Sequence, residues 1–396
     1  MIRTTPFHER VAALNQTGLW SHWAGHLVAD KYQMSEKFEY FAVRNAAGVF
    51  DTSPLYKYRI VGVDAERFLA GVLARDIRTC RPGRAQYTIW CDDDGFLMED
   101  GVIFRLASDE FLLSAARPNL AYLTNLAGRH HVEITDVSDE YGALAVQGPR
   151  ARAIVSAVAP EINGLGYFQL APAKVADASV LISRTGFTGD LGYEMWVPAE
   201  DAVGVWDAVM DAGAGHGIAP FGQIALSMAR IEAGLPLIDV DFHSSRFAWT
   251  AAQKSTPVEL GLGWMFKDLD RPFIGRDAIR GEIEEGTSRY RFTGFVIDWM
   301  DWDAKFGAAG LIPPKDHRPV EEDMMIYDDE GVRAGWSSSF MYSPMLQRHI
   351  GLARVRPDLA TPGVRINLEI TIDHQYHTVA AHVATLPLFN PERKTA

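Results

Sequence analysis

Two neighbouring acids, Glu99 and Asp100, are the first residues whose types and setting could do chemistry. They sit inside the otherwise apolar run 97–105 (LMEDGVIFR), which reads as a strand, so alternation places them on opposite faces. A carboxyl group in apolar surroundings has a raised pKa unless a partner compensates, and such a pKa suits proton transfer near neutral pH. The simpler alternative is an acid on an edge strand that faces water.

Two further elements carry polar groups in suggestive settings. The run 184–194 (RTGFTGDLGYE) combines a turn of three glycines with a strand that bears Glu194. The turn leaves backbone N–H groups free, and a carboxylate can accept two parallel hydrogen bonds. Arg230 falls near apolar positions at the end of a predicted helix, where an arginine often pairs with a buried carboxylate. A decorated hairpin turn and a surface arginine are the alternatives without a function.

Composition narrows the class of protein. The 396 residues include 38 Lys and Arg against 51 Asp and Glu, for a formal net charge of −13. This balance argues against nucleic-acid binding, which needs a basic face. The chain lacks both the dinucleotide fingerprint and the P-loop pattern. Two cysteines are too few for a disulfide framework, so we expect buried free thiols, no metal site, no membrane span and a cytoplasmic location.

The elements that must position these residues divide at about residue 285. Up to that point, strand and helix patterns alternate irregularly, which indicates an α+β body, and the apolar spacing over 36–50 predicts one of its helices. Beyond it, strand patterns dominate and helix signals are almost absent, which predicts an all-β C-terminal domain. The predicted strands there are 292–298, 323–327, 350–356, 364–372 and 378–385.

Six segments occur in the order and near the spacing of one family. They are AVRNAAGVFD (42–51), Tyr87 with Asp100 across a turn at Gly95, LAVQGP (144–149), TGFTGDLGYE (185–194), ARIEAGL (229–235), and TPVE (256–259) followed by Trp264. Together they resemble the tetrahydrofolate-dependent aminomethyltransferases, typified by the T-protein of the glycine cleavage system, and the related folate-dependent demethylases. The resemblance implies an enzyme with tetrahydrofolate as one-carbon acceptor and a three-domain, cloverleaf-like α+β fold around a central folate cavity.

The resemblance also implies domain limits. A body over residues 1–280 would consist of two interleaved α+β subdomains, roughly 1–50 with 140–250, and 51–139. A C-terminal β-barrel would occupy residues 285–396.

The family's functional residues can be carried over one at a time. Asp100 matches the catalytic aspartate near folate N5 and N10. Glu194 would pair with the pterin, whose ring N–H beside an exocyclic NH₂ matches a carboxylate, and Arg230 would contact the ligand or hold Glu194. Tyr87 would pack on the folate. The remaining residues expected to bind it are Leu55, Phe187 and Trp264.

Several segments depart from the T-protein pattern where the donor substrate would approach. DTSPL (51–55) replaces DVSHM, LLSA (112–115) replaces VVNA, and PLIDVD (236–241) replaces a YG element; an insertion over 298–314 extends the last domain. We therefore expect a small methylated donor whose carbon passes to N5 of tetrahydrofolate. The residues expected in the donor pocket are Tyr32, Gln33, Tyr56, His243 and Trp249.

Two alternatives stay open. The first is a true T-protein acting on an aminomethyl-lipoyl carrier protein, and the second is a non-enzymatic folate-binding regulatory protein. The chain lacks the KGCYxGQE-type motif of the second class. A separate flavoprotein subunit is a further expected partner of a demethylase. Folate is itself an anion, so the net charge does not recruit it, and its glutamate tail is expected toward solvent or beside local cations.

Overall fold

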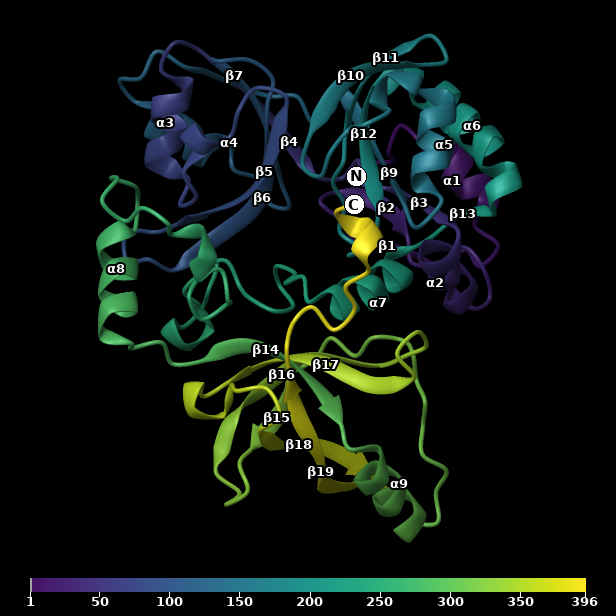
Figure 1. Cartoon of the computed structure of the whole chain (residues 1–396), viewed down its shortest axis with the longest axis vertical. Helices are drawn as coiled ribbons and strands as arrows, with labels where there is room; N and C mark the ends of the chain where they lie inside the picture. The colour runs from purple at the N-terminus through teal and green to yellow at the C-terminus, as the bar shows by residue number, and fades with distance from the viewer. Residues whose placement is uncertain (1) are drawn as a thin grey trace.

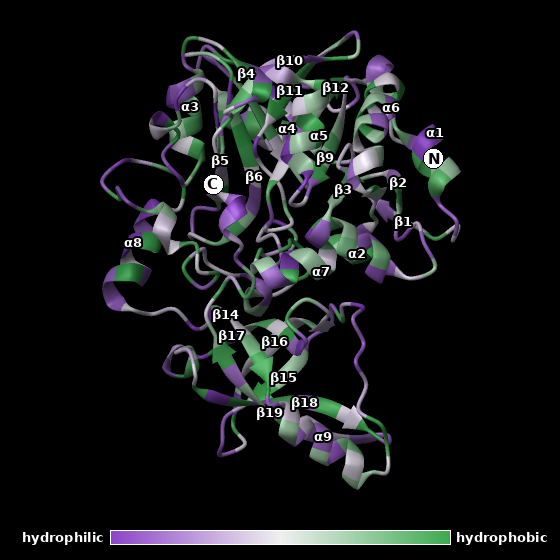
Figure 2. Ribbon diagram, turned by 45° about the vertical axis from the view of Figure 1, so that its right-hand side comes forward, coloured by the Kyte–Doolittle hydropathy of each residue, from purple (hydrophilic) through white to green (hydrophobic). Residues whose placement is uncertain are grey.

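Three lobes make up residues 2–396, the part of the chain that the computed structural model describes (Figure 1). Two lobes are mixed helix and sheet and the third is a closed barrel, as the predicted α+β fold with a C-terminal barrel requires. Figure 2 shows hydrophobic residues concentrated on the strands and hydrophilic residues mostly on the outer loops and helix faces. The sheets and barrel therefore form the cores of the lobes.

The first lobe is a six-stranded sheet covered by helices. Its strand order is β10 (Leu170–Val175), β11 (Ala178–Ser183), β12 (Gly192–Pro198), β9 (Tyr141–Gln147), β3 (Ala47–Asp51) and β13 (Ile218–Pro220). Helices α1 (His8–Leu14), α5 (Ala151–Val158) and α6 (Ala202–Gly213) pack on this sheet. A short hairpin, β1 (Trp20–Trp23) with β2 (His26–Ala29), lies beside it.

The helix predicted over 36–50 is wrong in its last five residues. Helix α2 (Glu36–Asn45) ends before Ala46, and residues 47–51 form the buried strand β3, which lies between β9 and β13. A short continuous apolar run fits a buried strand as well as a helix, so periodicity alone does not separate the two.

The second lobe is a five-stranded antiparallel sheet. Its order is β5 (Arg84–Cys91), β6 (Leu97–Arg105), β7 (Glu110–Ala115), β4 (Tyr56–Val61) and β8 (Glu133–Asp136), with α3 (Ala65–Val72) and α4 (Leu120–Ala127) packed against it. Strand β6, which carries Glu99 and Asp100, lies between β5 and β7. The edge-strand alternative for these acids is therefore wrong. Cys80 and Cys91 are buried free thiols, as predicted.

The third lobe is a closed barrel. Its order is β14 (Arg291–Ile297), β17 (Arg348–Val355), β16 (Arg333–Ser343), β15 (Met324–Tyr327), β18 (Arg365–Ile372) and β19 (Gln375–Ala384). Strand β16, rich in serine, escaped prediction. So did helix α9 (Trp299–Ala308) within the insertion, which Asp298 caps by accepting hydrogen bonds from the backbone of Met300 and Asp301.

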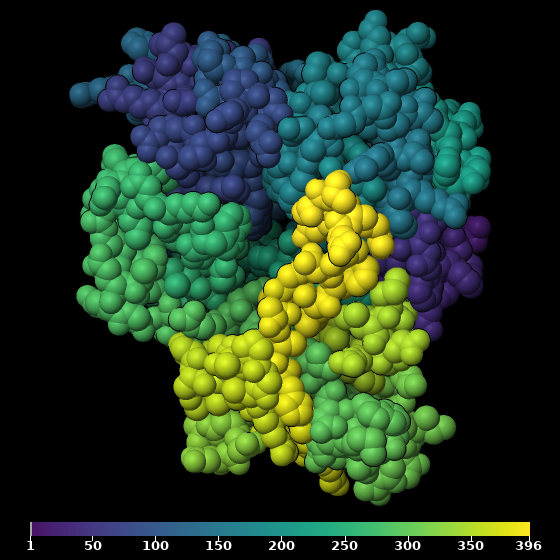
Figure 3. All heavy atoms as spheres, viewed as in Figure 1, coloured from purple at the N-terminus to yellow at the C-terminus, as the bar shows by residue number. Residues whose placement is uncertain are grey.

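Two elements join the lobes. Helix α7 (Gln223–Ala233) packs against α2 and against strands β16 and β17 of the barrel. Helix α8 (Arg276–Glu285) leads into β14, and after β19 the chain runs back across the face of the molecule to end beside the upper lobes (Figures 1 and 3). Within residues 2–396, no helix is both long and apolar enough to cross a membrane.

Candidate functional site

A cavity of about 1690 Å³ lies where the two sheets, α7 and the C-terminal segment meet. Ordinary small-molecule sites occupy roughly 300–1,000 Å³, so this cavity has room for a long ligand or for two ligands. The structure brings to its wall every residue predicted for catalysis or folate binding. They are Leu55, Tyr87, Asp100, Phe187, Glu194, Arg230 and Trp264.

Asp100 faces the cavity from β6. Its Oδ2 accepts a hydrogen bond of 2.9 Å from the Tyr87 hydroxyl on the neighbouring strand β5, and Oδ1 accepts none from another residue among 2–396. Burial raises the pKa of Asp100 to about 6, and the bond from Tyr87 opposes that rise. Asp100 therefore carries a carboxyl group that can take up or give a proton near neutral pH.

Glu99 points away from the cavity, as strand alternation predicts. Its side chain is in the protein interior, with 2% of the residue exposed, and its Oε1 has no hydrogen-bond partner. Burial raises the pKa of Glu99 to about 8, and the nearby Asp100 charge adds to the rise. Glu99 is thus a buried acid outside the site, on the same strand as the acid inside it.

Glu194 faces the cavity from β12, opposite the sheet that carries Asp100. The Thr185 hydroxyl donates to Glu194 Oε2, which leaves Oε1 open toward the cavity. Burial raises the pKa of Glu194, and the bond from Thr185 opposes the rise. A half-satisfied carboxylate in a cavity wall is an acceptor for ligand N–H groups.

The glycine-rich turn before Glu194 is shaped by Gln147 of β9. A Cβ at Gly186 or Gly192 would come within 2.0–2.2 Å of the Gln147 amide oxygen, so a side chain at either position would displace that amide from its hydrogen bonds. The same amide donates to the Thr185 carbonyl at 3.2 Å and accepts from the Thr188 hydroxyl at 2.9 Å. The amide thus fixes the turn that presents Phe187 and orients Thr185 toward Glu194.

Arg230 lies in the cavity wall but does not hold Glu194. Its guanidinium, 0% exposed, pairs with Asp241 at 2.5 Å and Glu321 at 2.7 Å, and donates to the Ser339 hydroxyl at 2.8 Å. Glu321 belongs to a segment that sequence reasoning did not connect to the site, whereas Asp241 ends the segment 236–241, which departs from the T-protein pattern. Arg230 therefore joins α7 to the barrel and presents a neutralised charge to the cavity.

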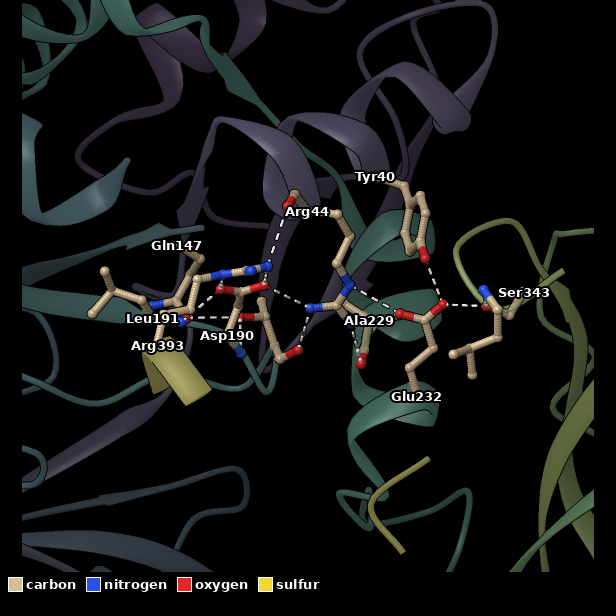
Figure 4. A network of polar contacts seen from close by, with 11 residues as sticks. Tyr40, Arg44, Gln147, Asp190, Leu191, Ala229, Glu232, Ser343 and Arg393 are labelled. Atoms are coloured by element: carbon tan, nitrogen blue, oxygen red, sulfur yellow. Dashed lines mark hydrogen bonds and ion pairs between the residues drawn. The ribbon is translucent and has the colours of Figure 1, made fainter. Parts of the chain in front are cut away.

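A second buried ion network lies behind the cavity wall (Figure 4). Glu232 of α7 accepts hydrogen bonds from Arg44 at 2.7 and 2.9 Å, from Tyr40 at 2.5 Å and from Ser343 of the barrel at 2.5 Å. Arg44 also reaches the Thr188 carbonyl of the glycine-rich turn at 2.9 Å. The network ties α2, α7, the turn and the barrel together, so it holds the walls of the cavity in register.

The same network anchors the C-terminal segment. Asp190, in the glycine-rich turn, accepts from Arg393 at 2.7 and 2.8 Å and from Arg44 at 3.4 Å. Lys394, the next residue, lines the cavity. The last part of the chain is therefore one of the cavity's walls.

Of the five residues predicted for a donor pocket, only Tyr56 lines the cavity. Tyr32 is buried in the core of the first lobe, because its ring packs among apolar side chains there. Gln33 and His243 lie outside the cavity, and Trp249 is 91% exposed. The structure therefore does not bring Tyr32, Tyr56 and Trp249 together.

Comparison with known proteins decides the family. The model of the GCVT N-terminal domain matches residues 7–268, and the model of the glycine cleavage T-protein C-terminal barrel domain matches residues 308–390. The chain belongs to the glycine cleavage T-protein family. It is thus a member of the tetrahydrofolate-dependent aminomethyltransferases, as the six sequence segments predicted.

Relatives across the family are similar along nearly their full length. An aminomethyltransferase of Streptomyces coelicolor is 32% identical over 368 residues, 91% of each chain. One of Saccharopolyspora erythraea is 30% identical over 394 residues, 98% of each chain. The crystal structure of glycine cleavage system aminomethyltransferase T from Bartonella henselae covers 98% of this chain and 99% of its own, with a TM-score of 0.82 at 22% identity, and so shows the same fold.

Some residues in the cavity wall of this T-protein family member were not identified by any sequence motif. Arg75, Arg84 and Lys394 also line the cavity, although they come from three separate parts of the sequence. Each is an ordinary charged residue in a loop or at an element's end, so neither type nor spacing marks it. Only the fold reveals that these cations share one cavity.

Proposed function

We propose that this protein is a tetrahydrofolate-dependent aminomethyltransferase that moves a one-carbon unit from an aminomethyl group on a lipoyl-type carrier to tetrahydrofolate. One observation carries the proposal: the carboxyl groups of Asp100 and Glu194, on two different sheets, face a single cavity of about 1690 Å³. The relatives are named aminomethyltransferases, which favours the carrier-bound donor over the small methylated donor that the sequence analysis preferred.

The part of the cavity around Glu194 suits the pterin ring of tetrahydrofolate. Glu194 Oε1 is free to accept, and the Thr185 bond holds the carboxylate in place. A carboxylate facing two adjacent N–H groups forms a bidentate pair, which fixes orientation as well as adding affinity. Phe187 and Tyr87 supply apolar and aromatic surface beside it.

Asp100 is the proton-handling group of the proposed reaction. When bound, tetrahydrofolate supplies the nucleophilic nitrogen that accepts the carbon. Asp100 holds a proton or a negative charge at Oδ1 according to pH, because its pKa of about 6 lies near the working range. As a carboxylate it stabilises positive charge that develops at the donor, and as an acid it supplies a proton to the leaving amine. In the transfer the carbon would lose its bonds to the donor nitrogen and to the carrier sulfur, which leave as ammonia and the carrier thiol.

The residues of the cavity wall position the two reactants. The ion pairs of Arg230 and Arg44 hold α7, the glycine-rich turn and the barrel against one another. Rigid walls keep two reactants aligned, and alignment of this kind can supply about 7–11 kcal/mol of a barrier.

A demethylase of a small methylated compound is the second candidate. The observation that favours it is the segment 236–240, which departs from the T-protein pattern and lines the cavity. Leu55, at the end of a second departing segment, lines it too.

Product analysis tests both candidates. The purified protein is incubated with tetrahydrofolate and, in separate reactions, an aminomethylated lipoyl carrier, methylated amines, sulfonium compounds and aryl methyl ethers. The proposal predicts 5,10-methylenetetrahydrofolate, ammonia and the freed carrier thiol from the carrier alone. Formation of 5-methyltetrahydrofolate from a small donor would replace the proposal by the second candidate, and no folate product from any donor would refute both.

A further inference from the structure

A buried lysine, Lys57, lies behind the part of the cavity wall that connects the two sheets. Residues 52–55 run from the end of β3 in the first lobe to the start of β4 in the second (Figure 1), and we call them the crossover. Thr52 and Leu55 of the crossover line the cavity, whereas Lys57 does not and is only 1% exposed. The crossover is therefore part of the wall between the two sheets that carry the facing carboxyl groups.

The ammonium group of Lys57 holds the crossover by hydrogen bonds to two backbone carbonyls. Its Nζ donates to the carbonyls of Ser53 and Leu55, each at 2.7 Å. Between these two residues lies Pro54, which has no backbone N–H to donate. The Leu55 N–H bonds back to the Thr52 carbonyl at 3.2 Å, so the crossover is a tight turn. The lysine thus supplies donors for the carbonyls on both sides of the proline.

The crossover is also bonded to the first lobe. The Thr52 N–H donates to the Ala143 carbonyl of β9 at 2.9 Å, and the Ala143 N–H donates to the Ser53 hydroxyl at 3.0 Å. Lys57 itself belongs to β4, where it pairs with Ser114 of β7 in the second sheet. Its ammonium group therefore links the second sheet to a turn that the first sheet holds.

A charge in this position is unfavourable for stability alone. The ammonium group of Lys57 bonds to carbonyls and to no carboxylate within residues 2–396. Burial lowers its pKa to about 8, although the nearby Asp51 charge opposes that fall. An ammonium group without an ion-pair partner is costly in a protein interior, and an apolar side chain of similar length would avoid that cost. The two carbonyls that Lys57 fixes, one of them from a residue of the cavity wall, explain a lysine here.

We propose that Lys57 is a positioning residue for folate binding, whose ammonium group fixes the crossover so that Leu55 keeps its place in the cavity wall. This proposal rests on the proposed function, since it takes tetrahydrofolate as the ligand. Lys57 lies behind the wall, so it acts through Leu55 and not by touching the ligand. Without the ammonium group the two carbonyls lose their donors, the crossover shifts, and the wall no longer fits the ligand closely.

A double-mutant cycle in tetrahydrofolate affinity tests this route of action. Calorimetric titration is applied to the wild type, Lys57→Met, Leu55→Ala and the double variant. Each single variant is expected to raise the Kd about tenfold, as the loss of one well-placed apolar contact does. The double variant is expected to raise it by no more than about twentyfold, because both changes disable the same contact. A rise of about a hundredfold, as independent effects would give, would overturn the proposal.

Hydrogen exchange measures the crossover without any ligand. In Lys57→Met, the amides of residues 52–56 are expected to exchange at least about tenfold faster than in the wild type, because local opening breaks fewer bonds. Arg271→Met is the matched control, since this buried arginine also donates to backbone carbonyls, those of Leu73 and Ala74 among them, and lies outside the cavity. It should speed exchange at the end of α3 and leave the Kd within about twofold of the wild-type value.

Three results would overturn the proposal besides additivity in the cycle. They are a folded Lys57→Met variant with the wild-type Kd, unchanged exchange over the crossover, and an equal loss of affinity in Arg271→Met. If circular dichroism shows that Lys57→Met does not fold, Lys57→Gln replaces it, since its neutral amide keeps two N–H donors, and its Kd should rise at least about threefold. If the wild type binds no tetrahydrofolate, the proposed function fails, and hydrogen exchange still decides whether Lys57 fixes the crossover.

Discussion

Removing the Tyr87 hydroxyl is expected to move the acidic limb of the pH profile toward higher pH. Tyr87 donates to Asp100 Oδ2 at 2.9 Å, and this bond stabilises the ionised carboxylate against the burial that raises its pKa to about 6. A hydrogen bond to a charged group contributes about 1.5–3 kcal/mol, and 1.36 kcal/mol corresponds to one pKa unit. Tyr87→Phe therefore raises the pKa of Asp100 by about one to two units.

The assay is kcat/KM for tetrahydrofolate measured from pH 5 to pH 9, because that parameter reports groups of the free enzyme. In the wild type, the acidic limb is expected at about pH 6 if Asp100 must be ionised. In Tyr87→Phe it shifts to roughly pH 7–8. Tyr56→Phe is the control, since Tyr56 lines the cavity and makes no hydrogen bond to Asp100. A limb that stays in place or moves to lower pH in Tyr87→Phe would refute the assigned pair.

Three further predictions follow from the buried acids. Asp100 and Glu99 have pKa values in the folded protein above those in the unfolded chain, so the free energy of unfolding rises as pH falls through these values. At pH 7, Asp100→Asn and Glu99→Gln should each raise the free energy of unfolding in urea by up to about 3 kcal/mol. Only Asp100→Asn should lose turnover. Glu194→Gln should weaken tetrahydrofolate binding roughly ten- to hundredfold by calorimetry, and an unchanged Kd would exclude Glu194 as the pterin acceptor. Glu232→Ala removes a carboxylate partner of the buried Arg44 and should lower the free energy of unfolding by about 3–5 kcal/mol in the same assay. The control Glu200→Ala, at an exposed residue, should leave that free energy unchanged.

The site residues with a recognisable local pattern were predictable. Alternation along β6 places Asp100 and Glu99 on opposite faces, and their apolar neighbours explain why both pKa values rise. Glu194 follows a glycine-rich turn, and α7 ends at Gly234 in the left-handed region, as its sequence pattern indicates. In each case the pattern lies within about a dozen consecutive residues, so it can be recognised without knowledge of the fold.

Features that depend on distant contacts were not predictable. Asp241 and Glu321 pair with Arg230 from segments 11 and 91 residues away, and nothing in either segment marks the pairing. Tyr32 and Trp249 are both aromatic residues of suitable type, yet one is in the core and the other faces solvent. Residue type suggested both for the donor pocket, and only tertiary packing shows that neither lines the cavity.

The central claim is that the cavity holds tetrahydrofolate with its pterin at Glu194 and its reacting nitrogens at Asp100. A crystal structure of the protein soaked with tetrahydrofolate measures this directly. The expected result is a pterin whose N–H groups lie within hydrogen-bond distance of Glu194 Oε1, with N5 facing the Asp100 carboxyl group. Folate bound outside this cavity, or bound with N5 turned away from Asp100, would contradict the claim.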